Sequence, residues 1–189
     1  MNLFPKVLSL ITAAIIPVVG YCEAVEYTLD KSHTSVNWQI NHFDFSNYYG
    51  KWEAMGKLWF DKEKPQNSKV EVDIKIEDLI TGNDKLNKHL KGADFFDQSQ
   101  YPEAKFVSNK VIVKNGKVSK VEGDLTLHGV TKPVVLDVTS QKLGKNMADK
   151  ETAGFSAKTK IKRSDFGMIK FLPGLADEVK LNIEVEANK

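Results

Sequence analysis

The sequence predicts an all-β fold of eight or nine antiparallel strands. Two observations lead to this prediction. Polarity alternates from residue to residue along most of the chain, and a single short segment with a four-residue apolar spacing interrupts it. Successive side chains of a strand point to opposite faces, so each strand has one apolar and one polar face. A parallel sheet covered by helices would bury both faces instead.

The first residues, 1–24, are expected to be a signal peptide rather than part of the fold. A positive charge precedes the apolar stretch Val7–Gly20, and Cys22 and Ala24 put small side chains three and one positions before a cut. The apolar stretch is short for a membrane span, and the bulky Tyr21 disfavours a lipid on the cysteine. We therefore expect export and no stable membrane insertion.

The rest of the chain, residues 25–189, is long enough to form one domain with its own core. Cys22 is the only cysteine and leaves with the signal peptide, so the domain has no disulfide and no cysteine metal ligand. The 27 basic and 25 acidic residues nearly balance, and they are spread along the polar faces of the strands. This spread argues against a nucleic-acid partner, which would need clustered basic residues.

Four strands are predicted before the interruption. They are Val25–Asp30, Thr34–Asn41, Lys51–Asp61 and Ser68–Glu77. In the last of them every second residue is valine or isoleucine. The alternation then stops, and Leu86 and Leu90 lie four positions apart behind Asn83, a residue that caps helix starts. This spacing predicts one short helical insertion over Asn83–Lys91.

Five strands are predicted after the helix. They are Lys105–Lys114, Val118–His128, Lys132–Gln141, Ala153–Ile161 and Glu178–Ala187. Asn115 and Gly116 predict a tight hairpin between the first two, because both central residues of that turn need positive φ. About eight strands can close into a barrel that side chains fill or that holds one small ligand. The periodicity leaves a barrel and a two-sheet sandwich both open.

Motifs for metal or cofactor chemistry are absent from the sequence. No pair of histidines has metal-site spacing, and no nucleophile elbow or phosphate-binding glycine loop occurs. The sequence therefore predicts no metal, no cofactor and no catalytic residue. One alternative stays open, a periplasmic hydrolase-type enzyme that acts on a small apolar substrate with His33, His89 or His128 as base.

Large apolar side chains on the inward faces and at strand ends are expected to line a cavity. The candidates are Trp38, Phe43, Phe45, Phe60, Phe95, Phe96, Phe106, Phe155, Ile161, Phe166 and Phe171. Small inward residues such as Gly123 are expected to leave room between them for an extended chain. A filled core is the other interpretation, and it would indicate a structural or interaction protein.

Several blocks of the sequence, in this order, resemble the YceI family. The blocks are Tyr27–Val36, Asn87–Asp97, Tyr101–Phe106, Gly123–Pro133, Gly154–Phe155 and Ile161–Gly167. The resemblance implies a single eight-stranded antiparallel, lipocalin-like barrel in the periplasm. It also implies an elongated apolar pocket for polyisoprenoids or similar long-chain amphiphiles, and no established catalytic activity.

On this basis we predict a periplasmic binding or carrier protein, not an enzyme, whose partner is an isoprenoid or fatty-acyl type lipid. Moving the apolar chain from water into the barrel would contribute about 0.8 kcal/mol per CH₂. A polar or phosphorylated head group is expected at the mouth, where a cation can meet it. His89 and Arg163 are the head-group candidates, because each lies in a polar stretch beside aromatic residues. The sequence leaves the identity of the lipid and the formation of a homodimer open.

Overall fold

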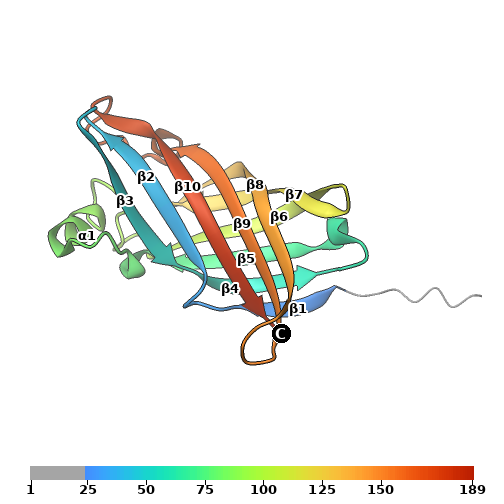
Figure 1. Ribbon diagram of the computed structural model, residues 1–189. Helices are drawn as coiled ribbons and strands as arrows, with labels where there is room; N and C mark the ends of the chain where they lie inside the picture. The colour runs from blue at the N-terminus through green and yellow to red at the C-terminus, as the bar shows by residue number, and fades with distance from the viewer. Residues whose placement is uncertain (1–23) are drawn as a thin grey trace, which may run out of the picture.

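The computed structural model describes residues 24–189, so the signal peptide expected at residues 1–24 lies, apart from Ala24, outside the described residues. Within them the chain forms one antiparallel sheet and a single α-helix, α1 (Asp84–Leu90) (Figure 1). The strands are β1 (Val25–Leu29), β2 (Ser35–His42), β3 (Ser46–Glu53), β4 (Met55–Phe60), β5 (Lys69–Lys75), β6 (Glu103–Lys114), β7 (Lys117–Leu127), β8 (Val130–Lys145), β9 (Glu151–Lys162) and β10 (Leu175–Asn188). Three short 3₁₀ helices are η1 (Pro65–Asn67), η2 (Ile76–Asp78) and η3 (Arg163–Phe166).

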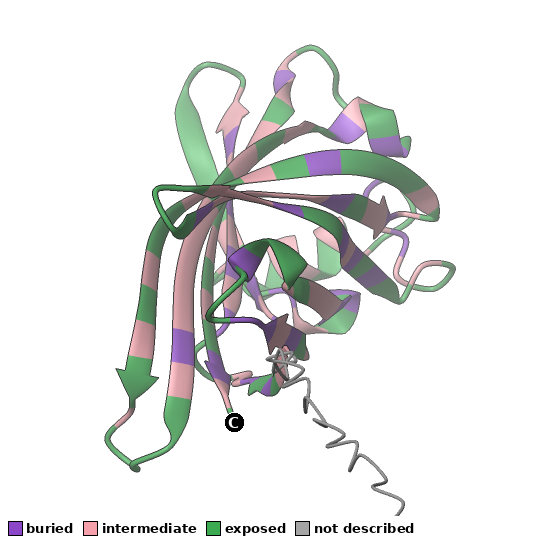
Figure 2. Ribbon diagram, turned by 90° about the vertical axis from the view of Figure 1, so that its right-hand side faces the viewer, coloured by how far each residue is buried: buried purple, intermediate pink, exposed green. Residues whose placement is uncertain are grey.

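The sheet closes into a barrel through β10. Around the barrel the order is β1, β4, β5, β6, β7, β8, β9 and β10, and β10 pairs back onto β1 at Thr28 and Leu29. β1 and β2 pair with successive parts of the same strand, β10, so together they take one position in the barrel. β4 pairs with β1 and β3 pairs with β2, so these two strands also share one position. The ten strands therefore occupy eight positions, which confirms the predicted eight-stranded antiparallel barrel. Buried and more exposed residues alternate along strands such as β2 (Figure 2), as the polarity pattern requires.

Local signals in the sequence predict the turns and the helix correctly. Asn115 and Gly116 have φ of 51° and 73° and join β6 to β7, as expected for a two-residue hairpin. His128 and Gly129, with φ of 51° and 72°, form the next such turn. The side chain of Asn83 accepts hydrogen bonds from two backbone N–H groups in the first turn of α1, which is the predicted cap.

The predicted strand Lys51–Asp61 is wrong in its bounds, because two separate strands, β3 and β4, cover this part of the chain. β3 already begins at Ser46, and the chain breaks at Ala54 before β4. Residues 46–49 are exposed on both faces, so their polarity does not alternate. The N–H of Ala54 donates to the carbonyl of Thr34, in the break between β1 and β2. The break between β3 and β4 therefore lies beside the break between β1 and β2, and a backbone hydrogen bond joins the two.

The end of the barrel that contains β1 and β4 is a filled core. Tyr27 and Phe60 are almost fully buried, and the rings of Phe60 and Phe155 meet edge to face with centroids 5.6 Å apart. Ala153 and Ala187, which are fully covered, face one another across β9 and β10. This end is closed by side chains.

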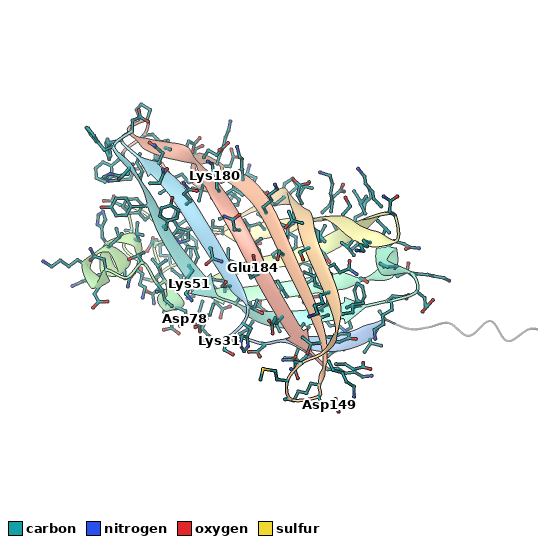
Figure 3. The ribbon with its side chains drawn as sticks, viewed as in Figure 1. Lys31, Lys51, Asp78, Asp149, Lys180 and Glu184 are labelled. Carbon is teal, nitrogen blue, oxygen red and sulfur yellow. The ribbon has the colours of Figure 1, made fainter. Side chains whose placement is uncertain are left out.

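The other end of the barrel is wider, because β3 leaves the edge of the sheet. β4 pairs with β5, but among the described residues β3 meets the segment after β5 through one isolated bridge, Lys51 to Ile80. Lys31 and Asp78, labelled with Lys51 in Figure 3, form an ion pair of 2.9 Å near this junction. The helix α1 lies beside β3 at this end (Figure 1). The residues after α1 reach back to the sheet, where Phe96 packs edge-on against Trp52.

No helix within residues 24–189 is both long enough and apolar enough to cross a membrane.

Two glycines in the strands, Gly50 and Gly123, accommodate aromatic rings rather than leaving open space. A Cβ atom on Gly123 would lie 2.5 Å from the ring of Phe106 and 2.5 Å from the carbonyl oxygen of Val107. A Cβ atom on Gly50 would clash in the same way with the indole of Trp38, its partner across β2 and β3. The expectation that Gly123 leaves room for a lipid chain is therefore wrong, because the Phe106 ring takes that room.

Replacing Gly123 by Ala should lower the free energy of unfolding by about 1–3 kcal/mol, because the backbone carbonyl of Val107 cannot easily move away. Chemical denaturation measures this change. Gly144→Ala is the matched control, since Gly144 lies in β8 with nothing within 4 Å of the added methyl. It should change stability by less than about 0.5 kcal/mol. Equal effects of the two substitutions would contradict the packing explanation.

Candidate functional site

A cavity of about 620 Å³ occupies the wide end of the barrel. This volume is within the range of small-molecule sites, about 300–1,000 Å³. Its walls are apolar side chains from both sides of the barrel. Those that the strands contribute include Val36, Trp38, Ile40, Trp52, Ile74, Ala104, Leu125, Leu127, Ile161, Val179 and Leu181.

Three inward aliphatic residues of β9 and β10 are less buried than the core of the barrel. Ile161 and Val179 face one another across the two strands, and Leu181 lies opposite Trp38 of β2. All three aliphatic side chains are only half-buried, although they point into the barrel. Other side chains cover them only in part, because one side of each borders the cavity. The filled-core interpretation therefore describes the β1–β4 end and does not describe this one.

The polar atoms of the two tryptophans in the wall do not face the cavity. The indole nitrogens of Trp38 and Trp52 are covered by protein atoms and have no hydrogen-bond partner among the described residues. Their rings lie 6.3 Å apart, and both line the cavity. The two indoles therefore present carbon to a ligand, and this wall selects for apolar surface.

About half of the side chains that the sequence predicts as pocket-lining border this cavity. They are Trp38, Phe43, Phe95, Phe96, Ile161 and Phe171. The Phe95 ring contacts Phe171 at 6.3 Å, and Phe171 contacts Phe43 at 6.5 Å. These contacts bring together segments that are far apart in the sequence, and they form one side of the mouth.

The remaining predicted side chains lie elsewhere. Phe60 and Phe155 belong to the closed core, and Phe106 packs on Gly123. Phe45 is 92% exposed in the turn between β2 and β3. Phe166 is 1% exposed and packs in the core beside the cavity without bordering it. All except Phe45 are covered as expected of large apolar residues, but they are distributed along the whole barrel and its connections.

The mouth of the cavity lies between α1 and the tip of β2 and β3. Lining residues at this point are exposed, which marks the opening, and they include Lys85 and His89 of α1 and Phe43 and Phe171 opposite. Lys85 and His89 are four residues apart, so they share one face of the helix. The His89 ring lies edge-on to Phe95 with centroids 4.9 Å apart. An ammonium and an imidazole of α1 thus border the opening, together with His42 beside Phe43 and Asn83 at the start of the helix.

Sequence reasoning missed several wall residues and one cation. Trp52, Val179 and Leu181 alternate correctly on inward faces, and that signal could have identified them. Lys85 could have been found from its spacing to His89 behind the helix cap. Nothing in the sequence sets these positions apart from inward residues of the closed end.

Arg163, the second head-group candidate, has a structural role that its sequence context did not indicate. Its guanidinium is buried and donates hydrogen bonds to the carbonyls of Met168, Leu175 and Ala176 at 2.7–2.9 Å. Burial lowers the pKa of Arg163, and the nearby Asp177 opposes that shift. The side chain borders the cavity, but three of its five N–H groups are engaged by carbonyls of the loop before β10 and of the first residues of β10.

None of the three histidines proposed as a catalytic base has the partners of a nucleophile–base relay among the described residues. His33 lies in the exposed turn after β1, where its Nδ1 is 3.0 Å from Asp30 and 3.3 Å from the Ser32 hydroxyl. The hydrogen bond to Asp30 raises the pKa of His33, and hydrogen bonds from Ser32 and His33 lower the pKa of Asp30 to about 2. Serine and aspartate both meet the same ring nitrogen, whereas a nucleophile–base relay needs one partner on each nitrogen.

The other two histidines also lack a catalytic partner. His128 Nδ1 is 2.9 Å from the carbonyl of Phe166, and its Nε2 is buried with no partner among the described residues. His89 has an aromatic neighbour and no carboxylate in contact among the described residues. In residues 24–189 no three His, Cys, Asp or Glu side chains come together as a metal site would require.

A closed antiparallel barrel with an apolar cavity open at one end defines the class of lipocalin-like barrels. The sequence profile of the YceI-like domain matches residues 27–187, and the chain belongs to the YceI-like family. It is 41% identical to UPF0312 protein PputW619_0484 of Pseudomonas putida (strain W619). The match extends over 173 residues and covers 90% of each chain.

Solved structures have the same barrel. A YceI protein of Campylobacter jejuni is 36% identical with a TM-score of 0.71, over 79% of this chain and 89% of that one. BcnA of Burkholderia cenocepacia is 27% identical with a TM-score of 0.72, over 84% of this chain and 99% of BcnA. A domain of Saccharophagus degradans, described as polyisoprenoid binding, is 15% identical with a TM-score of 0.61, over 86% and 97%. At that identity the similarity shows the fold alone.

Replacing Arg163 by Lys should lower the free energy of unfolding by about 3 kcal/mol. The flexible ammonium cannot meet three carbonyls at once, and each lost hydrogen bond from a charged group costs about 1.5–3 kcal/mol before relaxation. Denaturant titration measures the loss. Lys160→Gln removes an exposed pair with Glu178 of 2.9 Å and is the control, with less than about 1 kcal/mol expected. A variant of Arg163 as stable as the wild type would show that the loop needs no such contact.

Proposed function

We propose that this protein binds one long-chain isoprenoid or acyl lipid, with the chain in the barrel cavity and the head group at the mouth. The observation that supports this most is the cavity itself, about 620 Å³ bordered by apolar side chains and open at one end only. Each buried CH₂ of a ligand chain would contribute about 0.8 kcal/mol. An acyl or prenyl chain is the kind of ligand that gains most from such walls.

Within this proposal we favour an isoprenoid as the preferred chain, on the composition of the inner wall. The Saccharophagus degradans domain with the same fold is described as polyisoprenoid binding. The inner wall contains both flat indoles and branched aliphatic side chains, Trp38, Trp52 and Val179 among them. Methyl-branched, partly unsaturated chains can contact both kinds of surface.

The head group in this proposal meets α1 rather than Arg163. Lys85 is exposed at the mouth, and it has no ion-pair partner among the described residues. His89 lies one turn further along the same face of the helix. An ammonium that is free to pair is a better contact for a phosphate than a guanidinium already bound to three carbonyls.

We further propose that the protein acts as a carrier in the periplasm and not as an enzyme. The signal peptide expected at residues 1–24 supports the location. The membership of the YceI-like family and the arrangement of the histidines support binding over catalysis. A carrier needs a cavity that an apolar chain can enter, and the cavity beside α1 supports this role.

Replacing Val179 by Phe should weaken the binding of geranylgeraniol about tenfold or more, since the ring would fill space that several CH₂ groups of the ligand need. Quenching of the tryptophans in the wall, or calorimetry, measures the dissociation constant. Val135→Phe is the matched control, because Val135 is 42% exposed on β8 and does not border the cavity. If the Val179 variant binds as well as the Val135 variant, or if the wild type binds no prenyl lipid, the cavity is not the site.

Replacing Lys85 by Gln should weaken the binding of geranylgeranyl phosphate about three- to tenfold and leave geranylgeraniol unchanged, because only the phosphate has an anion to pair. Lys88→Gln is the control on the same helix, since Lys88 is exposed and does not border the cavity. Calorimetric titration of both ligands compares the variants. An equal loss for the alcohol and the phosphate would indicate that Lys85 acts through packing.

A further inference from the structure

Exposed apolar side chains gather at one end of the molecule. In the described residues most of the large apolar side chains with high exposure belong to two short segments, 43–49 and 169–172. They are Phe43, Phe45, Tyr48, Tyr49, Ile169, Phe171 and Leu172, here called the tip patch. Phe45 is 92% exposed and Ile169 is 65% exposed. Exposed apolar residues that are scattered singly need no explanation, but a contiguous patch usually marks an interaction site.

The two segments of the tip patch form one surface. The N–H of Phe43 donates to the carbonyl of Gly174 at 2.9 Å, and the Phe43 ring packs on Gly174. The rings of Phe43 and Phe171 are 6.5 Å apart. In Figure 1 the turn between β2 and β3 lies beside the turn that leads into β10, at the upper left. The patch is therefore held in place by backbone as well as by ring contacts.

The tip patch is continuous with the mouth of the cavity. Phe43, Tyr48 and Phe171 belong to the patch and also border the cavity. A lipid chain that leaves an apolar phase in contact with the patch would reach the cavity walls without crossing water. Phe45 and Ile169 are exposed and do not border the cavity, so a role in ligand binding does not explain them.

Charges at this end differ from those on the rest of the barrel. The outer faces of the strands carry paired ions, such as Lys120 with Asp137 at 2.6 Å. Within the tip patch segments the charged residues are Asp44 and Lys170, and Lys170 is paired with Asp94 at 3.1 Å. Lys85 and Lys88 of α1, next to the mouth, are exposed and unpaired among the described residues. An apolar surface flanked by free ammonium groups matches a bilayer with anionic head groups.

We propose that the tip patch docks the protein on the surface of a bilayer that contains anionic phospholipid, with the mouth of the cavity facing the membrane. The tyrosines and phenylalanines would lie at the level of the head groups, where aromatic side chains are enriched. A second copy of the chain fits this end less well, because a two-fold contact would bring the α1 lysines of both copies together. Docking does not require a lipid in the cavity, so this inference goes beyond the proposed function.

The test is flotation of the purified protein with vesicles of phosphatidylcholine, with and without one-third phosphatidylglycerol. The wild type should bind the anionic vesicles. Replacing both Phe45 and Ile169 by Ser should lower the bound fraction at least tenfold, because the inserted side chains are lost. Replacing Lys88 by Gln should lower the partition coefficient about fivefold on the anionic vesicles only.

Met147→Ser is the matched control. Met147 is fully exposed in the loop between β8 and β9, close in sequence to Asp149, which Figure 3 labels at the opposite end of the molecule. This variant should bind vesicles as the wild type does. Geranylgeraniol binding by the Phe45 and Ile169 double variant should be unchanged, which separates this test from that of the cavity.

Three results would overturn the docking proposal. The wild type could fail to float with either kind of vesicle. The double variant could float as well as the wild type. The wild type could be a dimer by light scattering that the double variant converts to a monomer while neither floats, which would assign the tip patch to a second copy.

Discussion

The buried guanidinium of Arg163 is the interaction on which the wide end of the barrel depends. β10 changes register between Leu175 and Val179 in its pairing with β2. At this irregularity the carbonyls of Leu175 and Ala176 accept hydrogen bonds from Arg163, and the carbonyl of Met168 accepts a third. Buried carbonyls without partners would cost free energy. One side chain therefore lets β10 change its pairing while the loop at the mouth keeps its backbone hydrogen bonds.

The barrel is asymmetric along its axis, and this asymmetry makes a site. At the β1–β4 end, pairs such as Phe60 with Phe155 fill the interior. At the other end, β3 separates from β5, and α1 with the Phe95–Phe96 segment takes its place beside the sheet. Side chains of α1 and of this loop cover the wide end only in part, and the cavity lies where this covering is incomplete.

The same end brings together the cavity, the cations of α1 and the exposed apolar tip patch. Each feature alone has an ordinary explanation in a barrel of this size. Their continuity is the observation on which the proposed lipid binding and membrane docking depend, because Phe43 and Phe171 belong both to the cavity wall and to the surface. The closed end carries the loop with Met147, which is exposed but borders no cavity.

Much of the fold could be predicted from the sequence because its signals are local. Alternating polarity predicts which face of each strand is inward, Asn115 and Gly116 predict their turn, and Asn83 predicts the start of α1. The break at Ala54 could not be predicted, since a hydrogen bond to Thr34, distant in the sequence, defines it.

The cavity wall also depends in part on local sequence signals and in part on tertiary contacts. Alternation by itself determined that Trp38 and Phe60 both point inward. It contains no information on their level along the barrel axis, and only the tertiary structure decided that one borders the cavity while the other fills the core. The sequence also contains no sign that Arg163, a head-group candidate, is engaged inside the fold while Lys85 is exposed. The difference between them is burial against backbone carbonyls, and those carbonyls meet Arg163 only in the folded chain.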